Sequence, residues 1–253
     1  MASLVEKLHE QIILAIENMI KPQKIGVAFS GGVDSSLMAK ICSDLGFEVT
    51  LLTLGFESSH DIEFSKKIAG LLRLKHITYA IEEEQFQQIA KETQNEISTD
   101  NLSWNENCIA FHYVSKLAQK NGIDKVLTSN GIDELFCGYN AYREVVDDGQ
   151  NAIMTIMESK LENEIKMMKE VNRISSKFGV KILQPLLSED FIEFAKSMPM
   201  DEKIKNRDDL VRKHIIRQLA LSVGVPSESA LKRKKALQYG SLIHKNLMKI
   251  RKT

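Results

Sequence analysis

Residues 25–36 read IGVAFSGGVDSS, and this stretch decides the fold. Its first five residues form a short apolar run typical of a buried strand, and Ser30, Gly31 and Gly32 interrupt that run. From Asp34 onward the apolar residues recur at helical spacing until Gly46 ends the pattern. The stretch therefore predicts a strand, a glycine loop and a helix.

Strand and helix patterns alternate on both sides of this stretch. A capping box at Ser3 and Glu6 predicts an opening helix that runs until Pro22. Further strands are expected over residues 47–54, 74–80 and 124–129, and helices over residues 61–72, over residues 82–94 and up to about residue 122. Residues 95–105 are polar and aperiodic, which is typical of a loop. We therefore expect an α/β fold built on one doubly wound parallel sheet.

The second half of the chain has a helical character. Beyond Tyr142 the strand signal fades, and helices are expected over residues 151–170, 188–198 and 208–223, separated by prolines. No stretch rich in Gly, Ser or Pro divides the halves, and no internal repeat is visible. We expect one unit with an α/β core over about residues 22–145 and a helical C-terminal lobe over about residues 150–253.

The composition excludes several classes of protein. Hydrophobic residues make up 43% and charged residues 27% of the chain, which is typical of a water-soluble globular protein. The 34 basic and 34 acidic residues cancel, so no global field attracts nucleic acid or an anionic membrane. The N-terminus shows no signal-peptide pattern, and three scattered cysteines suit a reducing compartment. We expect a cytoplasmic protein with no membrane partner. The balanced charge argues against nucleic acid as a partner as well.

The glycine loop has the composition of a phosphate-binding site. It falls where open parallel sheets bind ligands, at the carboxyl end of a strand and the start of a helix. Two glycines allow the backbone to approach a phosphate, and the hydroxyl groups of Ser30, Ser35 and Ser36 can donate further hydrogen bonds. The pattern matches neither a Walker A loop nor a dinucleotide fingerprint. An ordinary glycine turn followed by a serine helix cap is the structural alternative.

Asp34 places a carboxylate in the first turn of the helix that follows the loop. Beside a polyphosphate this charge is repulsive unless a cation lies between the two groups, and Mg²⁺ prefers carboxylate and phosphate oxygens. The pattern therefore indicates a magnesium ion. Without any ligand, the helix dipole alone would favour Asp34 at this position by about 0.3–1 kcal/mol.

Four sequence blocks together resemble the synthetase domain of the asparagine synthetases, within the N-type ATP pyrophosphatases or PP-loop superfamily. The first is Ser-Gly-Gly-x-Asp-Ser at residues 30–35, which resembles the pyrophosphate loop. The second, VLTSNGIDELFCGY at residues 126–139, resembles the asparagine synthetase signature. Weaker blocks lie within residues 173–186 and at residues 233–239. The blocks occur in the family's order and span about residues 24–241.

The resemblance implies roles for particular residues. The implied nucleotide-binding residues are Phe29, Ser30, Gly31, Gly32, Asp34, Ser35, Ser36, Leu54, Ser129 and Gly131. Asp34 and Asp133 would hold Mg²⁺ and neutralise charge on the leaving pyrophosphate, and Asn130 would face the substrate. Lys235 matches the lysine that stabilises the reaction centre, and Arg233 matches a pyrophosphate partner.

The activity implied by the resemblance is ATP-dependent amide formation. The carboxylate of aspartate or a related acid is adenylated with release of pyrophosphate, and ammonia then displaces AMP. The family has a glutamate where this chain has Asn130. Because an amide cannot act as a base at neutral pH, either another group deprotonates ammonia or the acceptor differs from aspartate.

The source of ammonia and two rival functions stay open. Full-length members of the family begin with a glutaminase domain whose cysteine follows the initiator methionine, whereas Ala2 occupies that place here. We therefore expect no glutaminase domain. Ammonia is expected to be free or to be delivered by a separate glutaminase subunit. The chain could also form a homo-oligomer, since the sequence does not fix the oligomeric state. The rivals are a tRNA-thiolating or NAD-synthetase-like adenylating enzyme, and a non-catalytic ATP-binding sensor or partner subunit. The balanced charge and scattered cysteines speak against thiolation.

Overall fold

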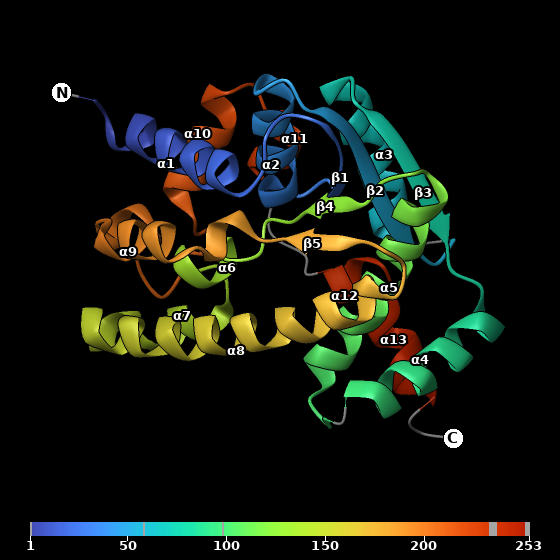
Figure 1. Ribbon diagram of the computed structural model, residues 1–253. Helices are drawn as coiled ribbons and strands as arrows, with labels where there is room; N and C mark the ends of the chain where they lie inside the picture. Colours follow the sequence, from blue (N-terminus) through green and yellow to red (C-terminus); the bar gives the residue numbers. More distant parts are fainter. Residues whose placement is uncertain (1, 58, 98, 233–236, 251–253) are drawn as a thin grey trace.

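The computed structural model describes residues 2–57, 59–97, 99–232 and 237–250. Parallel strands form one sheet in the order β3-β2-β1-β4-β5 (Figure 1). The strands are β1 (Lys24–Ala28), β2 (Glu48–Gly55), β3 (Lys75–Ala80), β4 (Lys125–Leu127) and β5 (Lys181–Leu183). Because β2 and β4 lie on opposite sides of β1, the strand order switches at β1, and ligand crevices form at such a point. The topology confirms the expected doubly wound α/β fold.

Helices cover both faces of the sheet. They are α1 (Leu4–Met19), α2 (Val33–Asp44), α3 (His60–Leu72), α4 (Glu83–Ile97), α5 (Leu102–Lys120), α6 (Ile132–Leu135), α7 (Asn140–Val145), α8 (Gln150–Ser176), α9 (Glu189–Ser197), α10 (His214–Ser222), α11 (Ser227–Ala230), α12 (Leu237–Gly240) and α13 (Ile243–Ile250). Short 3₁₀ turns lie at η1 (Val146–Asp148), η2 (Pro185–Leu187) and η3 (Met200–Glu202). Within the described ranges, no helix combines the length and the apolar character that crossing a membrane requires.

The sheet separates two hydrophobic cores. On β1, Ile25 and Val27 point into the core that contains residues of α1, α2 and α10. On β2, Leu52 and Leu54 point into the opposite core, which contains residues of α5, α8 and α13. Figure 1 shows α1 and α2 on one side of the strands and α8 on the other. Burial on both faces is what parallel strands require.

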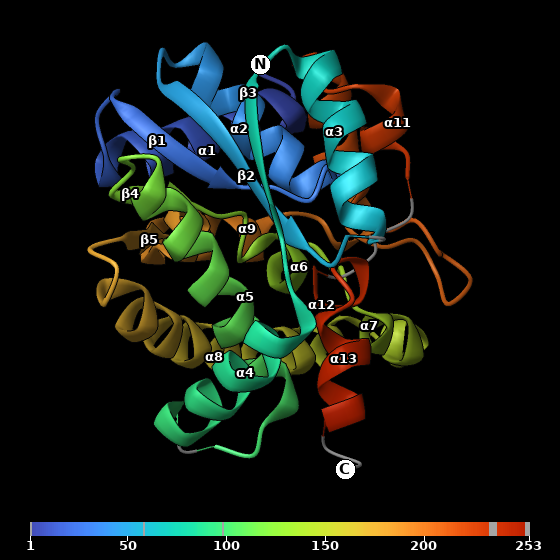
Figure 2. The ribbon, with the colours of Figure 1, turned by 90° about the vertical axis from the view of Figure 1, so that its right-hand side faces the viewer.

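The elements near the two ends of the chain are stabilised by different contacts. At the N-terminus, Ser3 Oγ accepts a hydrogen bond from the Glu6 N–H at 3.2 Å, and the Ser3 N–H donates to Glu6 Oε2 at 2.6 Å, which confirms the predicted capping box. At the C-terminal end, α12 and α13 pack beside α5 (Figure 2). The Phe56 N–H, just after β2, donates to the Ser241 carbonyl at 3.1 Å.

The predicted loop over residues 95–105 is wrong at both ends. Helix α4 continues to Ile97, which is buried, and α5 already begins at Leu102. Asn101 caps α5, because its side chain accepts a hydrogen bond from the Trp104 N–H at 3.3 Å. Polar residues of this segment therefore belong to helix ends, which local composition does not distinguish from a loop.

The second half differs from expectation in two places. A fifth strand, β5, pairs with β4 at the edge of the sheet, although no strand was predicted beyond residue 142. The helix expected over residues 208–223 begins only at His214. The reason is that Arg212 and Lys213 adopt left-handed φ values of 51° and 54°, which a right-handed helix cannot contain.

Candidate active site

The glycine loop lies at the carboxyl end of β1, and α2 begins directly after it at Val33. Gly31 has a φ of +77°, a left-handed conformation that favours glycine. An added Cβ at Gly31 would lie 3.1 Å from the Phe64 ring and 3.2 Å from the Ser65 Cα. The loop therefore requires glycine both for its turn and for its close packing against α3.

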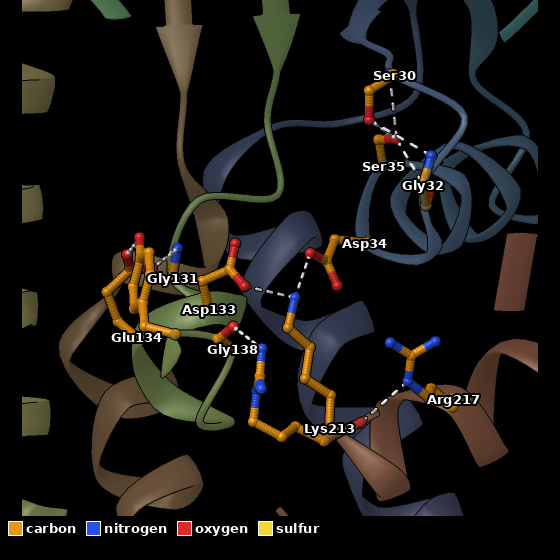
Figure 3. Close-up of polar contacts among 12 residues, drawn as sticks. Ser30, Gly32, Asp34, Ser35, Gly131, Asp133, Glu134, Gly138, Lys213 and Arg217 are labelled. Carbon is orange, nitrogen blue, oxygen red and sulfur yellow. Dashed lines mark hydrogen bonds and ion pairs between the residues drawn. The ribbon is translucent and has the colours of Figure 1, made fainter. Parts of the chain in front are cut away.

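Hydroxyl groups hold the loop in shape (Figure 3). The Gly32 N–H donates to Ser30 Oγ at 3.4 Å, and Ser35 Oγ donates to the Gly32 carbonyl at 3.2 Å. The Ser30 N–H donates to Ser35 Oγ at 3.3 Å. These contacts fix the conformation of the loop before any anion arrives, which lowers the entropy cost of binding one.

A second set of contacts fastens the loop to the C-terminal half. Ser229, in α11, donates its hydroxyl hydrogen to the Gly31 carbonyl at 2.7 Å, and its Oγ lies 3.0 Å from Ser36 Oγ. Ser36 and Ser229 are fully buried. Ser36 is thus buried behind the loop and is not among the described residues that line the cavity, whereas the resemblance implies a contact with the ATP phosphates.

A cavity of about 220 Å³ opens beyond the loop. Its apolar wall includes Phe29, Leu54, Phe111, Val114 and Met167. Its polar wall includes Ser30, Gly32, Asp34, Ser35, Ser129, Asn130, Asp133, Glu134 and Glu164. The first two sequence blocks, which follow β1 and β4, therefore meet in one cavity at the point where the strand order switches.

Asp34 and Asp133 converge on one buried ammonium group (Figure 3). The Lys213 Nζ lies 2.5 Å from Asp34 Oδ2 and 2.6 Å from Asp133 Oδ1. The Lys213 side chain is 1% exposed. Burial disfavours the charged form, but Asp133 and Asp34 outweigh that effect and raise the pKa of Lys213 above its usual value. Two carboxylates therefore share one ammonium group at this centre.

The aspartate pair fits a magnesium site that is completed by phosphate oxygens. Asp34 Oδ1 is buried and has no hydrogen-bond partner among the described residues, so it can accept a cation. The described part of the chain contains no group of three or more His, Cys, Asp or Glu side chains that could hold a metal by itself. Mg²⁺ at nucleotide sites is held by one or two carboxylates together with phosphates, and this donor set is of that kind.

A second carboxylate site lies farther along the cavity. Asn130 Nδ2 donates to Glu164 Oε1 at 2.5 Å, and both residues line the cavity. Glu164 comes from α8 and is 6% exposed. The amide at position 130 is therefore oriented by a buried carboxylate, and that carboxylate faces the same cavity.

Glu134 fixes the turn between Asn130 and α6, the helix that carries Asp133. It accepts a hydrogen bond from the Gly131 N–H at 3.0 Å and another from the Tyr139 hydroxyl. Burial, followed by the charge of Glu134, raises the pKa of Tyr139 well above its usual value, so the hydroxyl stays a donor. Gly131 has a φ of +106°, a conformation that favours glycine, so the turn before α6 requires glycine at this position.

Lys232, the residue before the last sequence block, lies beside the cavity. The Lys232 Nζ lies 2.8 Å from His60 Nε2 and 3.3 Å from the centre of the Phe64 ring, and these three residues line the cavity. Arg233 and Lys235, which the sequence assigns to catalysis, lie outside the described residues.

Comparison with known proteins decides the family. The family described as asparagine synthase matches residues 7–165 and, in an overlapping second match, residues 149–251. The chain belongs to the asparagine synthase family. This membership confirms the resemblance drawn from the four sequence blocks.

Relatives in the family are distant and longer. A protein assigned as a glutamine-hydrolysing asparagine synthetase of Methanocaldococcus jannaschii is 28% identical over 98% of this chain and 52% of its own length. Asparagine synthetase 1 of Arabidopsis thaliana is 23% identical over 80% of this chain and 36% of its own length. Among solved structures, NMN synthetase from Francisella tularensis overlays 93% of this chain and 75% of its own with a TM-score of 0.49 and 18% identity. The chain spans about half the length, or less, of these curated relatives.

Two polar residues of this asparagine synthase family member, Lys213 and Glu164, were not predicted from the sequence. Lys213 lies 179 residues from Asp34, and no spacing rule joins them. Glu164 is one acid among several on a long helix, and its burial depends on how α8 packs. By contrast, Glu134 and Tyr139 stood inside the second sequence block and could have been singled out from it.

Proposed function

We propose that this chain is an ATP- and Mg²⁺-dependent ligase that forms amides. A carboxylate oxygen of aspartate or a related acid attacks the α-phosphorus of ATP, and the bond to pyrophosphate breaks. Ammonia then attacks the acyl carbon, and AMP leaves. The observation that carries the proposal is the meeting of Asp34 and Asp133, from separate sequence blocks, beside the glycine loop.

The cavity walls suit the parts of ATP. The apolar wall around Phe29 and Leu54 would take adenine, and Ser129 lies where the ribose would follow. Ser30, Gly32 and Ser35 would take the phosphates by exchanging the hydrogen bonds that they make within the loop for bonds to phosphate oxygens. This orientation places the triphosphate next to the aspartate pair.

Asp34 and Asp133 would hold Mg²⁺, which when bound neutralises the charge that develops on the leaving pyrophosphate. Lys213 adds an ammonium group at the same place. Arg233 and Lys235 are proposed as further cations on the strength of family resemblance. Fixed charges in a water-poor cavity supply most of the rate enhancement in reactions of this kind.

Glu164 is proposed to act on the nitrogen nucleophile. Ammonium would give one proton to the Glu164 carboxylate, and after attack on the acyl carbon the nitrogen would give a second proton to the phosphate of the departing AMP. Asn130 donates to Glu164 and thereby aims the carboxylate into the cavity. A base on α8 would thus replace the glutamate that the family carries at position 130. The ammonia source is proposed to be free ammonium or a separate glutaminase subunit.

Incubation of the full chain with ATP, Mg²⁺, ammonium and single amino acids that carry a side-chain carboxylate tests the function. The expected result is equal formation of AMP and pyrophosphate that depends on one acceptor. Binding of ATP without acceptor-dependent AMP would contradict a ligase and favour an ATP-binding sensor.

Glu164→Gln separates the two steps of the reaction. Pyrophosphate release in a single turnover should stay within about threefold of the wild type, whereas amide formation should fall by about 10²–10⁴-fold. Hydroxylamine, a nucleophile that is neutral at pH 7, should restore transfer of the acyl group, with a hydroxamate as the product. Glu162→Gln, on an exposed residue of the same helix, is the matched control. Equal loss of both steps would contradict the assignment of Glu164 as a base.

A further inference from the structure

The fold imposes the position of the Lys213 ammonium group. Arg212 and Lys213 hold left-handed φ values, which residues other than glycine keep only where their surroundings enforce them. The Lys213 N–H donates to the Lys203 carbonyl at 2.7 Å, and the Arg217 N–H donates to the Lys213 carbonyl at 3.0 Å. Arg212 Nη2 donates to the Gly138 carbonyl at 3.0 Å. Several contacts therefore aim Lys213 at the aspartates.

Gly138 leaves the space that this arrangement needs. A Cβ at position 138 would lie 1.8 Å from Asp133 Oδ1 and 2.6 Å from Lys213 Cε. No side chain can occupy that volume unless the aspartate or the lysine moves. The glycine therefore permits the close approach of Lys213 to Asp133.

The charge arrangement sets a condition on metal binding. The ammonium lies against one oxygen of each carboxylate that would hold a divalent cation, Asp34 Oδ2 and Asp133 Oδ1. A metal that approached alone would meet this positive charge in a buried site, where repulsion is poorly screened. A triphosphate removes the conflict, because its negative oxygens can bind both the metal and the displaced ammonium.

We propose that Lys213 is a resident cation that keeps Asp34 and Asp133 together before the nucleotide binds and makes divalent-metal binding depend on the nucleotide. Lys213 is in this sense a positioning residue for the metal ligands. The inference rests on the proposed function, because it takes the two aspartates as metal ligands.

Titration of the full chain with Mn²⁺ alone, followed by the electron paramagnetic resonance signal of free Mn²⁺, tests the inference. Lys213→Gln removes the competing charge, so its affinity for Mn²⁺ alone should exceed that of the wild type by at least about tenfold. Lys213→Arg keeps the charge and should bind Mn²⁺ as weakly as the wild type. The control is Lys67→Gln, which removes an exposed lysine that pairs with Glu228 away from the aspartates, and its Mn²⁺ affinity should be unchanged.

A second measurement needs no variant. The Tm of the wild type should not change with Mg²⁺ alone. It should rise when Mg²⁺ and a non-hydrolysable ATP analogue are added together, and this rise in Tm should exceed the rise with the analogue alone. An equal rise with Mg²⁺ alone would overturn the inference even if Lys213→Gln failed to fold.

The outcomes separate the inference from the proposed function. A wild type that binds neither Mn²⁺ nor the ATP analogue, alone or together, contradicts the proposed function and the inference with it. A wild type that binds both together, while Lys213→Gln shows unchanged or weaker affinity for Mn²⁺ alone, overturns only the inference.

Discussion

Lys203 and Lys213 are both buried lysines of the C-terminal half, with exposures of 0% and 1%. The Lys203 Nζ donates to the Ala195 carbonyl at 2.5 Å and lies 5.7 Å from the centre of the Phe136 ring, and burial lowers its pKa to about 8. Lys213 instead faces two carboxylates, and its pKa is raised. Burial alone penalises an ammonium group, and only partners of opposite charge reverse the penalty. The comparison identifies Lys213 as part of a charged centre and Lys203 as part of the core.

The largest expected effect comes from removing a partner of Lys213. Asp133→Asn should lower acceptor-dependent pyrophosphate release by about 10²–10³-fold or more, because a proposed metal ligand and a partner of the ammonium are lost together. Asp44→Asn, which neutralises an exposed acid paired with Lys40 on α2, should stay within about twofold of the wild type. If Asp133→Asn kept a large share of the activity, Lys213 and its partners would not form a charged centre that differs in role from Lys203.

The pH dependence of the free energy of unfolding tests the difference between the two lysines at Lys203. Its pKa is about 8 in the folded chain and 10.5 in the reference state, so the unfolded chain binds more protons between these values. The contribution of Lys203 to the free energy of unfolding therefore rises with pH across that window, by up to about 3 kcal/mol. Urea unfolding of the wild type and Lys203→Met from pH 7 to 10 should show a difference that grows in favour of the wild type. If the difference in free energy of unfolding between the two proteins did not change with pH, burial would not lower the pKa of Lys203.

The smallest effect concerns the space beside Lys213. Gly138→Ala should lower the free energy of unfolding by about 1–3 kcal/mol, because its Cβ would overlap Asp133 and Lys213. Gly70, in α3, has nothing within 4 Å of an added Cβ, and Gly70→Ala should raise stability by about 0.5–1 kcal/mol. Denaturant midpoints of the two variants check this pair. Equal shifts at both positions would show that the Lys213 region is not tightly packed.

The parts of the molecule that could be predicted from sequence are those set by local patterns. The strand, loop and helix of residues 25–44 depend on a run of apolar residues, two glycines and a helical period. The capping box of α1 involves residues only three positions apart. The four sequence blocks also placed Asp34 and Asp133 in one site, and the structure brings both to Lys213.

The parts that could not be predicted depend on contacts between distant segments. Strand β5 has three residues and gains its partners only from β4, so its own pattern is too short to indicate a strand. The late start of α10 follows from left-handed residues that contacts with Gly138 and Lys203 hold in place. Glu164 is buried against Asn130 because of how α8 packs against α6, which composition does not encode.

The central claim is that the cavity beside Asp34 and Asp133 activates a carboxylate by adenylation. It is tested most directly with an acceptor whose carboxylate carries oxygen-18, incubated with ATP, Mg²⁺, ammonium and the full chain. Adenylation transfers one labelled oxygen to the phosphate of AMP, and mass spectrometry of AMP should detect it. Labelled acceptor consumed with unlabelled AMP, or with ADP and phosphate as products, would contradict the account.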